Sequence, residues 1–237
     1  MPLPKVLQNE SNSERIALLR AQKEKLDADS LLVHEIYTSL QGEGTHAGVL
    51  CDFIRLSVCH LRCTYCDTAH AFHEGKVHTL DDVVAQSQSA LVLITGGEPL
   101  LQPAVFSLLQ KLCDLGREVL LETSGAVSTQ KVDPRVRVIL DVKTPGSGEH
   151  ERHLRKNYEH LRSHDEVKFV ICNEDDYSFA LDECKTHALY EKCSVLFSPE
   201  AEGMSARWLA DAMVRDRVKA RLSLQQHKFI WGQARGV

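Results

Sequence analysis

Residues 50–66 have the sequence LCDFIRLSVCHLRCTYC, which places three cysteines directly after an apolar segment. The stretch Leu50–Leu56 has the length and apolar content of a buried strand, so Cys59, Cys63 and Cys66 are expected in the loop that follows it. In folds built from parallel strands, functional groups gather at the carboxyl ends of the strands. This stretch therefore indicates where the chemistry of the chain lies.

Apolar strands and amphipathic helices alternate around this loop. The segment Thr79-Leu80-Asp81-Asp82 is typical of a helix N-terminus, and Gly116 is a natural helix end. The alternation predicts an α/β fold with a parallel sheet and helical crossovers, either open or closed into a (β/α) barrel. Strands are expected at 33–40, 50–56, 91–94, 119–121, 136–140, 167–171, 195–197 and 222–224, and helices at about 80–89, 103–115, 174–190 and 204–219.

Composition points to one globular domain. Of the 237 residues, 43% are hydrophobic and 26% are charged, and the net charge of −5 gives no basic surface for nucleic acid. No apolar run is long enough to span a membrane, and the N-terminus lacks the apolar segment of a signal peptide, so a cytoplasmic location is expected. Residues 1–30 are polar and predict an N-terminal extension of unassigned role, with a short helix starting near Ser13, before a single domain at 31–237.

Eight cysteines in a reducing compartment favour metal ligation or catalysis where they cluster. A structural zinc requires four ligands, so His60 or His70 would have to complete a zinc site. Three thiolates on a [4Fe–4S] cluster would instead leave one iron open to a small molecule. The remaining cysteines are scattered singly and are expected to be small buried hydrophobes: Cys51, Cys113, Cys172, Cys184 and Cys193.

A second segment, Thr95-Gly96-Gly97-Glu98-Pro99, directly follows the apolar strand expected at 91–94. Glycines let a backbone approach a ligand closely. Together with the Cys-x3-Cys-x2-Cys spacing, this segment resembles the radical S-adenosylmethionine (SAM) superfamily. Members of that superfamily use a reduced [4Fe–4S] cluster to cleave SAM and start radical chemistry.

Further motifs resemble one family of that superfamily, the 7-carboxy-7-deazaguanine synthases. The motif Leu40-Gln41-Gly42-Glu43-Gly44 precedes the cysteines and Cys66-Asp67-Thr68 closes them, and matching segments follow at 122–125, 141–143 and 226–228. The resemblance covers roughly residues 33–232. It implies a compact, incomplete (β/α) barrel of parallel strands, a homodimer, and bound [4Fe–4S] cluster, SAM and Mg²⁺. It also implies conversion of 6-carboxy-5,6,7,8-tetrahydropterin to 7-carboxy-7-deazaguanine with loss of ammonia, on the route to queuosine, with an external electron donor such as flavodoxin or ferredoxin.

The resemblance also implies roles for individual residues. Cys59, Cys63 and Cys66 would hold the cluster, and Thr68 would give Mg²⁺ an oxygen ligand. The SAM site is expected to include Cys66, Asp67, Gly96, Gly97, Glu98, Ser124, Asp141, Val142, Lys143 and Ser198. The substrate pocket is expected to include Leu40, Gln41, Gly42, Glu43, Arg55, Thr95, His227 and Val237. No side chain is assigned as an acid or base, because the cofactor carries the difficult step.

Two other functions share part of the pattern. A glycyl-radical activating enzyme has the same cysteine spacing, but it acts on a protein and leaves the motif at 40–44 unexplained. A non-enzymatic zinc-binding module would use the cysteines alone. Single residues also have structural interpretations: Arg55 could pair with Asp52 or Asp67, and Lys143 could be an exposed strand end. The joint order of the motifs along one chain favours the synthase.

Overall fold

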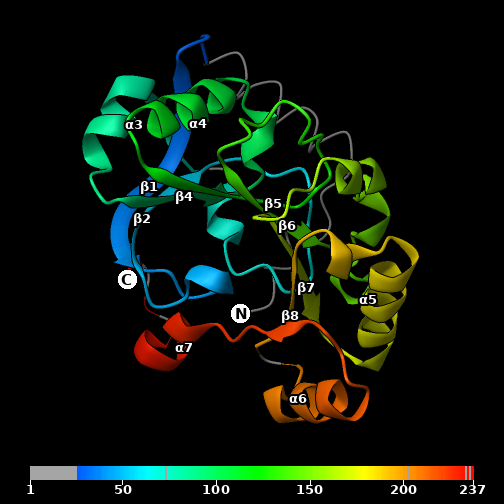
Figure 1. Cartoon of the computed structure of the whole chain (residues 1–237). Helices are drawn as coiled ribbons and strands as arrows, with labels where there is room; N and C mark the ends of the chain where they lie inside the picture. The colour runs from blue at the N-terminus through cyan, green and yellow to red at the C-terminus, as the bar shows by residue number, and fades with distance from the viewer. Residues whose placement is uncertain (1–25, 73, 202, 233, 235) are drawn as a thin grey trace.

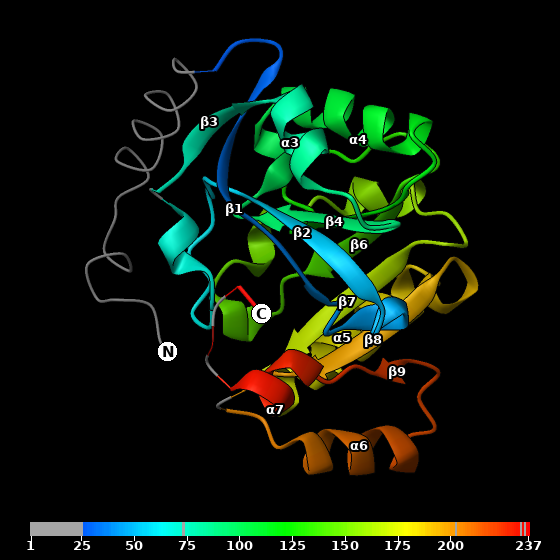
Figure 2. The same cartoon turned by 90° about the vertical axis from the view of Figure 1, so that its left-hand side faces the viewer.

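The structure is a computed structural model that describes residues 26–72, 74–201, 203–232, 234, 236 and 237. One curved sheet forms its centre, and helices lie around the outside of the curve (Figures 1 and 2). The strand order in this nine-stranded sheet is β3-β1-β2-β4-β5-β6-β7-β8-β9. The strands are β1 (Ser30–Leu40), β2 (Leu50–Leu56), β3 (Lys76–Thr79), β4 (Leu91–Gly96), β5 (Glu118–Thr123), β6 (Arg137–Val142), β7 (Glu166–Ile171), β8 (Ser194–Pro199) and β9 (Arg221–Leu222).

Most of the sheet is parallel, as predicted. Each neighbouring pair from β2 through β9 runs parallel, and β3 and β9 form the two edges, so the barrel is incomplete. The exception is β1, which runs antiparallel to both β2 and β3. The short connection at 41–49 accounts for the β1–β2 direction, because a parallel pair needs a crossover of about a dozen residues or more.

Five α-helices are present in the described part of the chain: α3 (Leu80–Gln86), α4 (Ala104–Asp114), α5 (Glu174–Thr186), α6 (Ala206–Arg215) and α7 (Gln226–Trp231). Thr79 caps α3 in a capping box with Asp82, and Gly116 follows α4 with a φ of 75°, which confirms both signals. Neither β3 nor α7 was expected from the sequence. The connections from β5 to β6 and from β6 to β7 contain no α-helix, which makes the barrel compact.

Two apolar clusters occupy the two faces of the sheet. The larger lies between the sheet and the outer helices and includes Ile54, Ile94 and Leu108. The smaller lies on the inner face and consists of Cys51, Phe53, Leu91, Leu93, Leu120 and Ile139. Because side chains alternate between faces along a strand, Arg55, Thr95 and Glu122 are the next inner-face positions toward the carboxyl ends. The inner cluster is therefore an apolar floor beneath a polar site.

Some sequence predictions lie outside what the structure describes. The expected helix near Ser13 falls in residues 1–25, and the extension predicted at 1–30 is covered only at its end, where Ser30 begins β1. The assignment of 31–237 as one domain stays a prediction. Among the described helices, none combines the length and apolar character needed to cross a membrane.

Candidate active site

The cysteines lie in the loop that leaves β2, as the sequence predicted. Cys63 is buried, while Cys59 and Cys66 are half-buried. Burial raises the pKa of all three thiols, to about 11 for Cys63, and the neighbouring thiols raise the pKa of Cys59 further. Coordination to a metal removes the proton from a thiol. Three adjacent, largely buried thiols therefore fit the ligand set of an iron–sulfur cluster with one open iron.

The Gly96-Gly97 pair packs directly against the start of this loop. Gly97 N–H donates to the Leu56 carbonyl at 2.9 Å, and Glu98 N–H donates to the Val58 carbonyl at 2.8 Å. A Cβ on Gly96 would lie 2.1 Å from the Leu56 oxygen, and one on Gly97 would lie 2.0 Å from the Val58 oxygen. Gly96 also has a φ of 131°. Only glycine allows this approach, so the pair holds the cysteine loop against the end of β4.

Glu98 joins the same turn to the end of β5. Its fully buried carboxylate accepts hydrogen bonds from Leu100 N–H at 3.1 Å, Thr123 Oγ1 at 2.7 Å and Ser124 N–H at 2.9 Å. The structure thus brings the expected SAM residues Glu98 and Ser124 together. These bonds occupy the carboxylate within the protein, so its contact with the cofactor stays a prediction.

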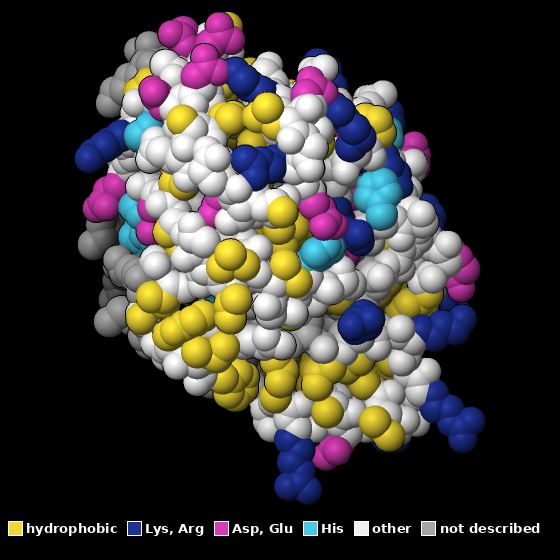
Figure 3. Space-filling model, turned by 60° about the vertical axis from the view of Figure 1, so that its left-hand side comes forward, with side chains coloured by type: hydrophobic (Ala, Val, Ile, Leu, Met, Phe, Trp, Pro, Cys, Tyr) yellow, Lys and Arg dark blue, Asp and Glu magenta, His cyan; other side chains and the backbone are white. Residues whose placement is uncertain are grey.

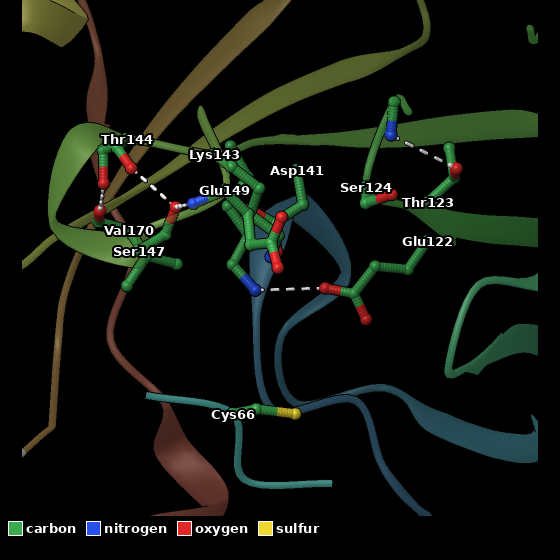
Figure 4. A network of polar contacts seen from close by, with 12 residues as sticks. Cys66, Glu122, Thr123, Ser124, Asp141, Lys143, Thr144, Ser147, Glu149 and Val170 are labelled. Carbon is green, nitrogen blue, oxygen red and sulfur yellow. Dashed lines mark hydrogen bonds and ion pairs between the residues drawn. The ribbon is translucent and has the colours of Figure 1, made fainter. Parts of the chain in front are cut away.

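Lys143 lies across from the cysteine loop, paired with Asp141. Its Nζ is 2.8 Å from Asp141 Oδ2 and 5.7 Å from the centre of the Tyr65 ring. Burial alone would lower the pKa of Lys143, but the charge of Asp141 and its other neighbours raises it well above the usual value. In Figure 4, Asp141, Lys143 and Glu122 project from neighbouring strands into one region, with Cys66 below them. The interpretation of Lys143 as an exposed strand end is therefore wrong, since its side chain is only 12% exposed.

The other expected SAM residues differ in what they can offer. The side chain of Val142 packs in the large core, so only its backbone could meet a ligand. Ser198 is buried in β8. Asp67 is exposed at the loop and its carboxylate lies 3.6 Å from Lys228 Nζ. Thr68 Oγ1 lies 3.7 Å from Cys66 Sγ, which places an oxygen donor next to the cysteines.

Arg55 is held on the inner face by two partners that the sequence did not predict, Glu35 and Tyr37. Its Nε lies 2.7 Å from Glu35 Oε1, and its Nη2 donates to Tyr37 Oη at 3.1 Å. Asp52, one of the expected partners, instead accepts from Thr38 and from Ser89 N–H. A guanidinium carries more N–H donors than these two contacts use, so Arg55 can still bind a carboxylate.

His34 and His70 gather around the same glutamate. Their ligand atoms and those of Glu35 lie within 4.8 Å of one another. Because the Arg55 guanidinium already pairs with that carboxylate, we assign no metal ion to this group.

The C-terminal segment closes over the motif at 40–44. Gln226 N–H donates to the Gly42 carbonyl at 2.9 Å, and Gln225 Nε2 donates to Glu43 Oε1 at 2.9 Å. A Cβ on Gly42 would lie 2.3 Å from His227 Nδ1, so the imidazole packs on the bare glycine. His227 thus lies beside this motif, and its contact with substrate stays a prediction. Val237 is 39% exposed, and contact between its carboxylate and substrate stays a prediction.

One charged group of the site was missed from the sequence. Lys168 in β7 lies 2.6 Å from Glu43 Oε2 and 3.0 Å from Glu122 Oε1. Thr95 Oγ1 donates to the other oxygen of Glu122 at 3.0 Å. The signal that could have revealed Lys168 is a lone charge within the apolar strand Val167-Lys168-Phe169-Val170-Ile171.

Comparison with known proteins identifies the family. A model of the radical SAM superfamily matches residues 53–145, which include the cysteine loop and the Gly-Gly pair. The 7-carboxy-7-deazaguanine synthase of Chlorobaculum tepidum is 42% identical over 214 residues, covering 87% of this chain and 97% of that protein. The chain belongs to the 7-carboxy-7-deazaguanine synthase family. Synthases of Koribacter versatilis (41% identical; 84% of this chain and 96% of that protein) and Thermoplasma acidophilum (35%; 87% and 100%) agree.

A solved structure supports the fold of this synthase. The crystal structure of QueE from Escherichia coli matches with a TM-score of 0.70 and 23% identity, over 92% of this chain and all of that one. Membership of the radical SAM superfamily carries with it a [4Fe–4S] cluster and SAM. Family membership therefore shows that the protein is an enzyme. The comparisons support neither of the two other functions, a glycyl-radical activating enzyme or a zinc-binding module.

Proposed function

We propose that this synthase converts 6-carboxy-5,6,7,8-tetrahydropterin to 7-carboxy-7-deazaguanine with release of ammonia, in the formation of queuosine or a related 7-deazapurine. The observation that carries the proposal is the position of Arg55, a carboxylate-binding group on the inner face at the end of β2, where the cysteine loop begins. A carboxylated substrate held there would lie over the apolar floor and next to the expected cofactor. Family membership supplies the reaction class.

The residues present fit a cofactor site and a substrate site side by side. Cys59, Cys63 and Cys66 would hold the cluster, and cluster and SAM together supply a 5′-deoxyadenosyl radical that removes a hydrogen atom from the pterin. Lys143 would donate a hydrogen bond to the carboxylate of SAM, because Asp141 keeps the lysine charged and a lysine ammonium has three N–H donors. Arg55 would orient the pterin through its carboxylate.

Anaerobic reconstitution with iron and sulfide, followed by reductant, SAM and the carboxylated pterin, tests this function. The expected product is the deazaguanine, and SAM cleavage without it would contradict the substrate assignment. Cys66→Ala should lose the iron–sulfur absorbance and at least about 99% of product formation while keeping its circular dichroism, because an incomplete ligand set cannot hold the cluster. Cys184→Ala, a buried cysteine on α5, is the matched control and should keep both cluster and activity.

We also propose that Thr68 supplies an oxygen ligand to Mg²⁺ near the substrate. Magnesium prefers hard oxygen ligands and keeps several waters, so one protein ligand is sufficient. Removal of magnesium with a chelator should raise the KM for the pterin, and Thr68→Ala should abolish the response to added Mg²⁺. Thr68→Ser keeps the hydroxyl and should keep the response; a full response in Thr68→Ala would contradict the assignment.

We further propose a homodimer that receives electrons from a flavodoxin- or ferredoxin-like donor. Support for the dimer comes from exposed apolar side chains near the C-terminus: Phe229 is 75% exposed and Ile230 56%, and both line a shallow hollow with Leu222. Figure 3 shows hydrophobic side chains gathered on the lower part of this face. Sedimentation should give twice the chain mass, and Phe229→Asp should give the monomer. Leu115→Asp replaces an apolar side chain after α4 that is 55% exposed, and it should leave the dimer intact.

A further inference from the structure

Lys168 occupies an unusual position for a lysine. It lies on the inner face of β7 beside Asp141 of β6, and only 7% of its side chain is exposed. Its ammonium lies 2.6 Å from Glu43 Oε2 and 3.0 Å from Glu122 Oε1. Glu43 comes from the loop between β1 and β2, and Glu122 comes from β5. One buried cation therefore bridges two carboxylates that belong to distant parts of the chain.

The three groups together hold one net negative charge above an apolar floor. Such a charge is costly in apolar surroundings unless further polar groups meet it. Thr95 donates to Glu122 and Gln225 donates to Glu43, but each carboxylate oxygen can accept more than one hydrogen bond. The remaining acceptor capacity and the excess negative charge suit a ligand edge that is rich in N–H donors.

We propose that Lys168 is a positioning residue for the substrate, which holds Glu43 and Glu122 as a fixed pair of ionised acceptors for the N–H groups of an aminopyrimidinone ring. The inference rests on the proposed function, which supplies that ring. Arg55 pairs in register with Thr95, and Thr95 donates to Glu122. A row of inner-face groups thus has a carboxylate-binding cation at one end and the two carboxylates at the other, which matches a substrate with a carboxylate and an N–H edge.

A purely structural role for Lys168, in which it only holds the 41–49 loop in place, does not explain why it contacts both carboxylates. That loop has other attachments: Thr45 N–H donates to Glu166 Oε1 at 3.3 Å, and Gly44 N–H donates to Ser223 Oγ at 3.2 Å. Glu122 is not part of the loop, and burial alone would raise its pKa. Lys168 reverses that effect and, with Thr95, lowers the pKa of Glu122 to about 2.

Other charged groups face the same unit. Lys143 favours the ionised form of Glu122, and Asp141 favours the charged form of Lys168. His227 faces Glu43 from α7, and burial lowers the pKa of its imidazole. Because the usual histidine pKa is about 6.5, His227 is neutral above that pH, and its charge does not change over the rest of the assayed range.

The first test is the holoenzyme of Lys168→Met, reconstituted anaerobically and assayed from pH 6 to 9. Loss of the cation leaves two like-charged carboxylates together, so one takes up a proton near neutral pH. The KM for the pterin should rise about tenfold or more at pH 7, with the KM for SAM within about twofold of wild type. That raised KM should fall again as pH increases and the second carboxyl ionises. Lys111→Met, at a half-exposed lysine on α4 that pairs with Asp81, is the matched control and should change neither constant.

A second variant and a substrate-free measurement separate this role from a structural one. In Lys168→Met we expect the pKa of one carboxyl to be higher in the folded protein than in the unfolded chain. Such a group stabilises the fold while it is protonated, and that stability is lost as the pH rises through the raised pKa. The melting temperature relative to wild type should therefore fall between pH 5 and 8. Adding Glu122→Gln removes the like-charged pair, so the double variant should lose this pH dependence while its KM for the pterin stays high.

The results of these experiments distinguish a failure of the Lys168 proposal from a failure of the proposed function. A pterin KM in Lys168→Met that equals wild type, equal losses for pterin and SAM, or a melting profile parallel to wild type would overturn the role of Lys168. Failure of the wild-type enzyme to make the deazaguanine would contradict the proposed function instead. The melting profiles test the charge arrangement without substrate in either case.

Discussion

At the scale of single residues, the site consists of buried cations that each have a carboxylate partner. Arg55 pairs with Glu35, and Lys143 pairs with Asp141. Burial of an unpaired charge is costly, so each cation has a partner, but each partner leaves some N–H donors of the cation unused for a further acceptor. The two pairs therefore fit the proposed binding of two different carboxylates, one on the substrate and one on SAM.

Replacement of Arg55 by alanine tests that division. Arg55→Ala should raise the KM for the pterin by about tenfold or more, because a charged hydrogen bond contributes about 1.5–3 kcal/mol. Steady-state kinetics with each ligand varied in turn measures the effect. Arg55→Lys keeps the charge without the planar fork and should lie between alanine and wild type. Equal increases in both KM values would count against a clamp on the substrate carboxylate.

At the scale of elements, the end of β4 positions the cysteine loop through backbone contacts. The Val58 carbonyl occupies the space where a Cβ on Gly97 would lie. Val58 itself has a φ of 80°. A positive φ is costly for a β-branched residue, so the loop conformation depends on its hydrogen bonds to this turn. The glycines therefore shape the cysteine loop.

Gly97→Ala should displace that loop. The added methyl group would lie 2.0 Å from a backbone oxygen, so we expect a loss of about 2–4 kcal/mol in the free energy of unfolding and a reduced iron content after reconstitution. Denaturant unfolding and iron analysis measure the two effects. Gly116→Ala is the control: its φ of 75° costs about 1 kcal/mol, but open space surrounds it, so iron content should stay at the wild-type level. Normal iron content in Gly97→Ala would contradict this account.

At the scale of the whole molecule, the curved sheet brings charged groups from separate strands into one buried unit. Glu122 is half-buried, and its removal from water would alone raise its pKa, but Lys168 and Thr95 lower it to about 2. A lowered folded-state pKa contributes stability above the unfolded pKa of about 4.3, and that stability is lost as pH falls through the folded value. The fold should therefore be sensitive to acid.

Thermal unfolding between pH 6 and pH 2.5 measures this sensitivity. The melting temperature of the wild type should fall by about 5 °C or more below pH 4.5, since one kcal/mol corresponds to about 2–4 °C for a protein of this size. Glu122→Gln cannot titrate at this position, so its curve should fall less steeply. Glu151→Gln, an exposed position, should follow the wild-type curve. A Glu122→Gln curve as steep as wild type would show that this carboxylate does not carry the effect.

The sequence by itself determined the reaction class and most of the sheet. Cysteine spacing, the Gly-Gly pair and the apolar strands are local patterns, and the structure places β2, β4 and α4 where those patterns predict them. Only the tertiary structure decided the charge partners, because they are far apart in the chain: Lys168 is 46 residues from Glu122, and Gln225 is 182 residues from Glu43. Strand register and the return of the C-terminal segment bring these groups together, and no local pattern encodes that register. The three cysteines thus indicated which cofactor this protein uses, while the fold of the sheet decided which charged side chains lie together on its inner face.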